Sequence, residues 1–165
     1  MSGEPWTWDE RAHPRVAGAF TASTSGLEWR DRLEWWDRLD TAPEDAIVGK
    51  VLCVCAASAI ARAVIAVGDG MPRASDALEL LDAWIDDPTE DRFEQICSLL
   101  FGDGEPPDLS PHGVVRWALR TATSSVGNYE AGWALSGTCE AAELSGFSSE
   151  DLCKIAERAV LARRK

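Results

Sequence analysis

Few residues in this chain have the types and spacing that catalysis or metal binding requires. The sequence contains two histidines, His13 and His112, and neither a His-x-x-x-His nor a Cys-x-x-Cys pair that would bind a metal ion. A phosphate-binding glycine loop and a Gly-x-Ser-x-Gly nucleophile elbow are also missing from it. A Cys–His pair such as Cys97 with His112 is left open by the residue types alone. We therefore expect a protein without enzymatic activity and without a metal ion or cofactor.

The five cysteines are better explained as small buried residues than as ligands or disulfides. Their number is odd and no secretion signal precedes them, so a disulfide framework is not expected. Cys53 and Cys55 form a Cys-x-Cys pair, but on a helix these positions point about 200° apart and cannot chelate one ion. We expect both to pack as small hydrophobic side chains.

The chain is strongly acidic, with a formal net charge of -12 at pH 7. Such a surface keeps a protein soluble and repels nucleic acid and anionic membranes, while it attracts a basic protein. We expect a protein partner with a basic surface, and no binding to nucleic acid or to a membrane. Simple solubility is the alternative explanation of the charge.

Acidic residues concentrate around Pro88, where two predicted helices meet. They recur at spacings of three and four residues, which would gather negative charge at one helix–helix corner. Two neighbouring tryptophans on an earlier predicted helix cannot both face the core, so one of them would be an exposed interface anchor. The candidate partner-binding residues are therefore Trp35, Trp36, Asp82, Asp86, Asp87, Glu90, Asp91 and Glu94. A purely solvated acidic face is the alternative.

A long, almost wholly apolar run at residues 47–67 predicts the element around which the rest of the chain packs. A helix that is apolar on nearly all sides has to be buried. The run is long enough to span a membrane, but Lys50 and Arg62 interrupt it and small residues dilute it. We expect a buried core helix rather than a membrane span. Because the chain begins without a basic start or an apolar signal region, we expect a cytoplasmic protein.

Apolar spacing and the positions of proline and glycine predict an all-α single domain, a bundle of six to seven helices around this central one. Helices are expected at 25 to about 39, 43–68, 72–86, 90–101 and 111 to about 125. A further helix would run through Tyr129 and end at Gly146, and the last would begin after a Ser148 cap.

Tryptophan is unusually frequent, with eight residues against one tyrosine. We expect Trp84, Trp117 and Trp133 in the core because indole rings bury a large apolar area. Residues 1–24 show no helical period, which predicts an extended N-terminal arm that packs through Trp6 and Trp8. The remaining residues, 25–165, would form the helical domain.

Three stretches, 52–64, 72–85 and 115–125, together resemble a known family. Their order is similar to that of a group of bacterial immunity proteins associated with polymorphic toxins. The residues that carry most of the resemblance are Pro72, Arg73, Ala77, Glu79, Ala83 and Trp84. The resemblance implies an all-helical binder that neutralises a toxin and has no catalytic residues of its own. The alternatives are a helical adaptor or scaffold subunit of a multi-protein assembly, and an enzyme or ligand-binding bundle with a pocket that the sequence does not show.

Overall fold

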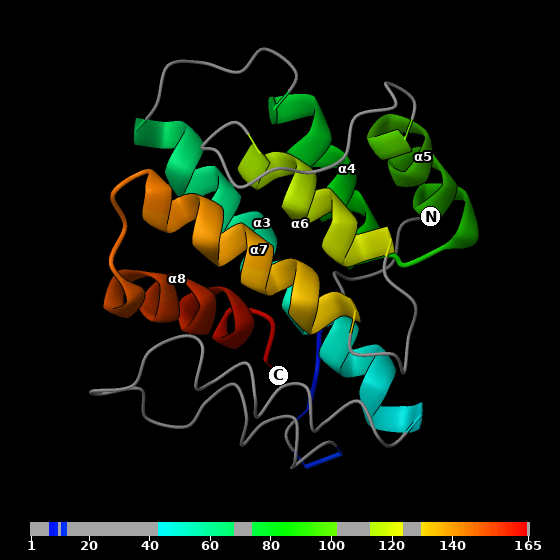
Figure 1. The fold of residues 1–165 in the computed structure, drawn as a ribbon. Coiled ribbons are helices and arrows are strands. Elements are labelled where there is room, and N and C mark those ends of the chain that lie inside the picture. Colours follow the sequence, from blue (N-terminus) through cyan, green and yellow to red (C-terminus); the bar gives the residue numbers. More distant parts are fainter. Residues whose placement is uncertain are drawn as a thin grey trace.

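A computed structural model describes residues 7–9, 11–12, 43–67, 74–101, 113–123 and 130–164. This part of the chain forms six helices and no strand, which confirms the predicted all-α fold (Figure 1). The helices are α3 (Pro43–Val67), α4 (Ala74–Asp86), α5 (Glu90–Phe101), α6 (Val114–Thr123), α7 (Glu130–Leu144) and α8 (Ser149–Leu161). The helix predicted at 25–39 and the boundary predicted at residue 24 lie outside the described residues.

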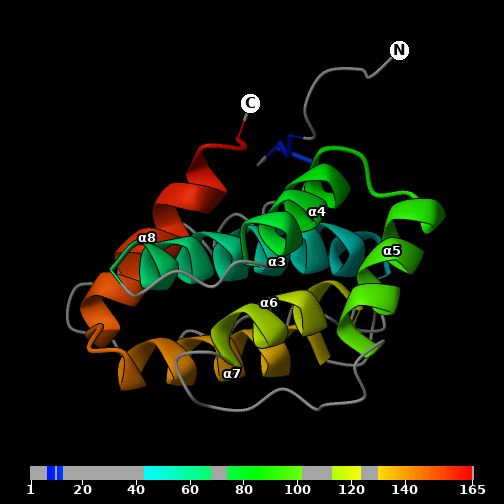
Figure 2. The ribbon, with the colours of Figure 1, turned by 90° about the horizontal axis from the view of Figure 1, so that it is seen from above.

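Helix α3 is the centre of the bundle, in contact with α4, α6, α7 and α8. Figure 2 shows it between α4 on one side and α7 on the other. Leu52, Val54, Ala56 and Ala57 are fully buried, and nearly every side chain from residue 51 to 61 is buried with them. The apolar run is therefore explained by helices packed on several of its sides.

Residues Val48–Ala66 of α3 are the one described segment that is long and apolar enough to cross a membrane. Buried residues make up 67% of this stretch, and the central helix of a globular domain has the same length and composition. Each of the two cationic side chains in this stretch interacts with residues of a neighbouring helix. Arg62 is exposed and pairs with Asp82 of α4. The Lys50 ammonium lies 5.3 Å from the ring centroids of both Trp84 and Phe93, a cation–π arrangement that accommodates the charge at the edge of the core.

Local signals place several helix ends where the sequence predicts them. The predicted helix 90–101 coincides with α5, and Thr89 caps it by accepting a hydrogen bond from the Arg92 backbone N–H at 3.4 Å. Ser148 is the N-cap of α8, and its Oγ accepts from the backbone N–H of Asp151 at 3.1 Å. Gly146 has a φ of 101°, a left-handed conformation that ends α7 at little steric cost.

The N-terminal segment is tied to the other end of the chain by Trp8. This residue is only 2% exposed, and its indole N–H donates to the carbonyl of Val160 at 2.9 Å. Its backbone N–H donates to the carbonyl of Arg163, also at 2.9 Å, next to a parallel bridge with Arg164. The prediction that the arm packs through Trp8 is confirmed, whereas Trp6 lies outside the described residues.

The tryptophans correct one prediction. Trp84 and Trp117 are buried, but Trp133 is 57% exposed, so its expected place in the core is wrong. Helix α7 carries apolar and small residues on all sides, and the sequence therefore does not show which of its faces points inward. Trp117 from α6 fills the space beside α7, and Trp133 packs against that ring in an edge-to-face arrangement from the outside.

Gly137 allows this close approach of α6 and α7, which leads to a first prediction. A Cβ atom at this position would lie 2.3 Å from the Trp117 ring. We expect Gly137→Ala to lower the free energy of unfolding by about 1–3 kcal/mol because a rigid ring must move. A matched control is Gly49→Ala in α3, where a Cβ meets nothing within 4 Å and the better helix propensity should stabilise by up to about 1 kcal/mol. Urea unfolding of both variants measures the difference, and equal stability would contradict the packing described for Gly137.

Candidate protein-binding surface

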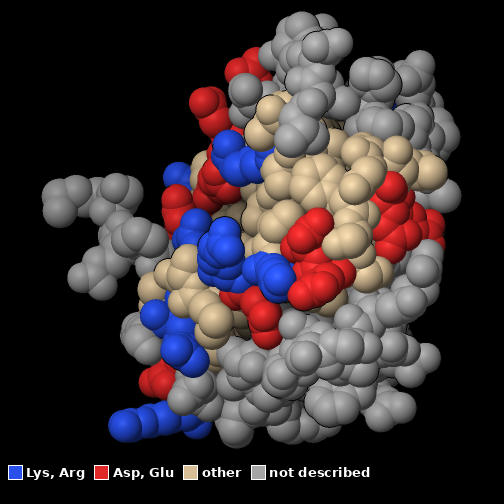
Figure 3. Space-filling model, turned by 90° about the vertical axis from the view of Figure 1, so that its left-hand side faces the viewer, with Lys and Arg blue, Asp and Glu red and all other residues tan. Residues whose placement is uncertain are grey.

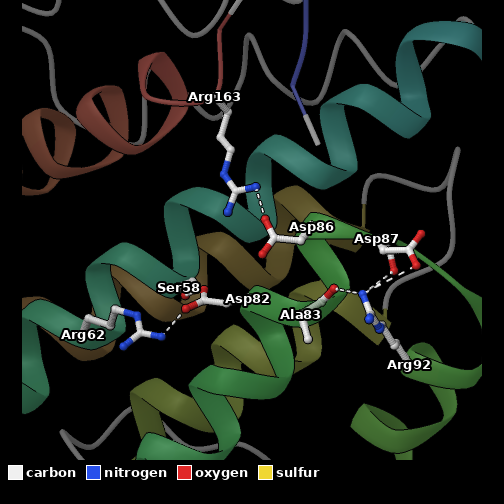
Figure 4. Close-up of polar contacts among 8 residues, drawn as sticks. All are labelled: Ser58, Arg62, Asp82, Ala83, Asp86, Asp87, Arg92 and Arg163. Carbon is white, nitrogen blue, oxygen red and sulfur yellow. Dashed lines mark hydrogen bonds and ion pairs between the residues drawn. The ribbon is translucent and has the colours of Figure 1, made fainter. Parts of the chain in front are cut away.

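The predicted acidic corner is formed by the C-terminal end of α4, a short connection and the start of α5. Arg92 of α5 closes this corner, because its Nη1 donates to the carbonyls of Ala83 at 2.6 Å and Asp87 at 3.3 Å (Figure 4). The same guanidinium lies 3.7 Å from the Asp87 carboxylate. The two helices are therefore held at a defined angle by one arginine that satisfies the last carbonyls of α4.

Two of the acidic side chains on α4 are engaged inside the molecule rather than directed only at solvent. Asp82 pairs with Arg62 and accepts a hydrogen bond from Ser58 Oγ at 3.1 Å, both on α3. Asp86 lies 2.5 Å from Arg163, beyond the end of α8 (Figure 4). Because these ion pairs are partly exposed, each is expected to contribute only about 0.2–1 kcal/mol, but they place α4 against its neighbours.

The other three acidic residues form the α5 acidic edge, which we define as Glu90, Asp91 and Glu94. All three are exposed, and within the described part of the chain none of them forms an ion pair. A shallow open groove of about 650 Å³ runs along this edge. Its lining residues are Leu80, Asp91, Glu94, Gln95 and Ser98.

The structure thus divides the six predicted acidic residues into two groups. Asp82, Asp86 and Asp87 have arginine partners in the chain, whereas the α5 acidic edge presents its carboxylates beside a groove. Gln95 and Ser98 line the groove and were not among the predicted residues, although their spacing from Asp91 puts them on the same helix face. Trp35 and Trp36 lie outside the described residues.

Positive charge is also present at the surface, although the net charge is strongly negative. Figure 3 shows one face on which clusters of lysine and arginine lie next to clusters of aspartate and glutamate. Such mixing weakens a long-range field over this face, so the regions where carboxylates have no basic neighbour matter most for attracting a cation. In the α5 acidic edge no carboxylate forms an ion pair within the described residues, although Arg92 and Lys50 lie on or near the same helix.

No disulfide joins the five cysteines, and Cys53, Cys55, Cys139 and Cys153 are buried as predicted for small core residues. Burial raises the pKa of Cys55 to about 12 and raises the pKa of Cys139 as well. Cys97 is partly exposed, and burial raises its pKa too, so little of it is thiolate at neutral pH. Its suggested partner His112 lies outside the described residues, within which no group of three His, Cys, Asp or Glu side chains could hold a metal ion.

The exposure of the thiols predicts their order of reaction. At pH 8 we expect Cys97 to react first with a disulfide reagent, and the four buried thiols to react only as fast as the protein unfolds. Absorbance of the released thiol measures both phases. Cys97→Ser is expected to remove the fast phase alone, and a fast phase that persists in this variant would show that a core cysteine is accessible.

Compared with protein-family models, with curated proteins and with solved structures, the chain shows no match to any of them. Its function is therefore inferred from its own residues and their geometry.

Proposed function

We propose that the chain is a non-enzymatic protein-binding module, and specifically an immunity-type inhibitor that neutralises a bacterial toxin or effector with a basic surface. The observation that carries this proposal is the α5 acidic edge, where the exposed carboxylates of Asp91 and Glu94 line a groove together with Leu80 and the exposed Glu90 precedes them on the same helix. The sequence resemblance to immunity proteins gives the partner class.

The physical basis is electrostatic complementarity. A basic partner approaching a chain of net charge -12 is accelerated, and the carboxylates of α5 that form no ion pair within the described residues direct it to this helix. Exposed charges at the rim of an interface act mainly on the association rate and lose their effect as salt increases. If the acidic surface served only solubility, the association rate would depend on the net charge and not on these three residues in particular.

The test compares two sets of substitutions with the same change of net charge. The first is Glu90→Gln, Asp91→Asn and Glu94→Gln together, and the control is Asp76→Asn, Glu150→Gln and Asp151→Asn, three exposed acidic residues on α4 and α8 that do not line the groove. Each protein encoded next to this chain is expressed in a host cell, first alone and then together with the chain. A toxin that arrests growth when it is expressed alone should no longer do so when the chain is present. With that protein, the first set should slow association about tenfold or more at low salt, and the control set much less.

Two results would contradict the proposal. Equal association rates for both sets would show that the α5 acidic edge is a solubilising face. A chain that relieves no growth arrest, although it binds its neighbours, would favour the adaptor function instead.

A further inference from the structure

The described N-terminal segment joins the rest of the protein through one residue. Among residues 7–9 and 11–12, only Trp8 forms hydrogen bonds with another described element. Its indole N–H donates to the carbonyl of Val160 and its backbone N–H donates to the carbonyl of Arg163, each at 2.9 Å. Because both acceptors belong to the last turn of α8 and the residues just after it, Trp8 fixes the path of the chain at that end.

Arg163 extends this connection from α8 to α4. Its backbone N–H donates to the Val160 carbonyl at 3.1 Å, so that one carbonyl receives both this N–H and the indole N–H of Trp8. Its guanidinium lies 2.5 Å from Asp86, the last residue of α4 (Figure 4). Burial raises the pKa of the Cys55 thiol on α3, while Arg163 lowers it and Asp86 raises it, which places the ion pair close to the central helix.

Asp86 lies in the turn of α4 that holds α5 in place. The Asp87 backbone N–H donates to the Ala83 carbonyl at 3.1 Å, which closes this turn around Asp86. The carbonyls of Ala83 and Asp87 accept hydrogen bonds from Arg92 of α5. A shift of Asp86 would therefore move the acceptors that position the start of α5, where the α5 acidic edge begins.

We propose that Trp8, Val160, Arg163 and Asp86 form a clasp through which the N-terminal segment sets the position of the α4–α5 corner. With Trp8 docked, Arg163 is held against Asp86 and the corner keeps the geometry described above. When the segment is displaced, the end of α8 and the last turn of α4 loosen together, and α5 is no longer held at one angle. The clasp is a property of the fold and does not depend on whether α5 binds a toxin.

The test uses the full chain and three substitutions. Trp8→Phe keeps an aromatic ring in the core but removes the indole N–H donor. Asp86→Asn removes the charge that pairs with Arg163. The matched control is Asp82→Asn, one turn earlier on α4, which breaks an ion pair with Arg62 of α3 and leaves the residues of the clasp unchanged.

Hydrogen exchange of two backbone N–H groups, followed by NMR, measures the effect. The Asp87 N–H reports on the last turn of α4, and the Phe147 N–H, in the connection between α7 and α8, reports on the rest of the fold. Relative to Phe147, Trp8→Phe should accelerate exchange at Asp87 about threefold or more. In the Asp86→Asn background the same substitution should add less than about 1.5-fold because the link is already broken, whereas in the Asp82→Asn background it should keep its full effect.

The coupling is also expected in the reverse direction, since a coupling free energy between two sites is reciprocal. Asp86→Asn should accelerate exchange of the Trp8 indole N–H about threefold or more, and Asp82→Asn should leave it unchanged. This measurement needs no substitution of Trp8, so it decides the question even if Trp8→Phe does not fold.

Three results would overturn the proposal. Trp8→Phe could accelerate exchange at Asp87 and Phe147 by the same factor, which a loss of overall stability alone would produce. The effects of Trp8→Phe and Asp86→Asn could multiply in full, which would show that the two residues act independently. Asp86→Asn could leave exchange of the Trp8 indole N–H unchanged. The association rates that test the proposed function are a separate measurement and do not enter this one.

Discussion

Replacing Ala57 or Ala61 with glutamate should abolish the folded state of the chain. Both alanines are 0% exposed in α3, at the centre of the bundle. A carboxylate there would be buried without a partner, or would have to take up a proton and still lack space. The expected loss exceeds about 4 kcal/mol, a large part of the roughly 5–15 kcal/mol that keeps a typical domain folded.

The control for this prediction lies on the same helix. Ala66 is exposed near the C-terminal end of α3, so Ala66→Glu introduces the same side chain without burying it. Circular dichroism during heating should show a cooperative transition for Ala66→Glu and for the unmodified chain, and none for the two core variants. A normal transition in Ala57→Glu would mean that α3 is not the core helix.

Replacing Trp8 with alanine should be the most damaging change outside the helices. It removes the side chain of a residue that is only 2% exposed, and with it the hydrogen bond from the indole N–H to the Val160 carbonyl. Truncation of a buried aromatic residue typically costs about 3–5 kcal/mol, which should lower the melting temperature by roughly 10 °C or more. The variant should also loosen Arg163, whose carbonyl accepts from the Trp8 backbone and whose side chain pairs with Asp86.

Trp133→Ala provides the comparison, because it removes the same side chain from a position that is 57% exposed. We expect it to cost about 1 kcal/mol, mainly through the lost edge contact with Trp117. The melting temperatures of the two variants show how much of the loss comes from burial of the side chain, because the residue type removed is the same. If Trp8→Ala and Trp133→Ala have the same melting temperature, the N-terminal segment does not contribute to the core.

The acidic corner shows which parts of a candidate site can be predicted from the spacing of neighbouring residues. The spacing of three and four residues predicts that carboxylates gather where α4 meets α5, and Figure 4 shows Asp82, Asp86 and Asp87 along the second half of α4 and just after it. It does not predict that arginines from α3 and from the residues after α8 reach Asp82 and Asp86, because such pairs join residues 20 and 77 positions apart. Only the folded chain separates these acids from the α5 acidic edge.

What the sequence determined by itself is the set of helices and most of their described ends. Caps at Thr89 and Ser148, the left-handed Gly146 and the apolar run of α3 act within one or two helical turns, so their signals are contained in neighbouring residues. What only the tertiary structure decided is the direction of each face. The apolar and small residues of α7 are spread around the helix and mark no preferred side, and Trp133 points outward because Trp117 of α6 already occupies the space next to Gly137. The burial of Trp8 against Val160 likewise depends on packing between the two ends of the chain, which no local spacing encodes.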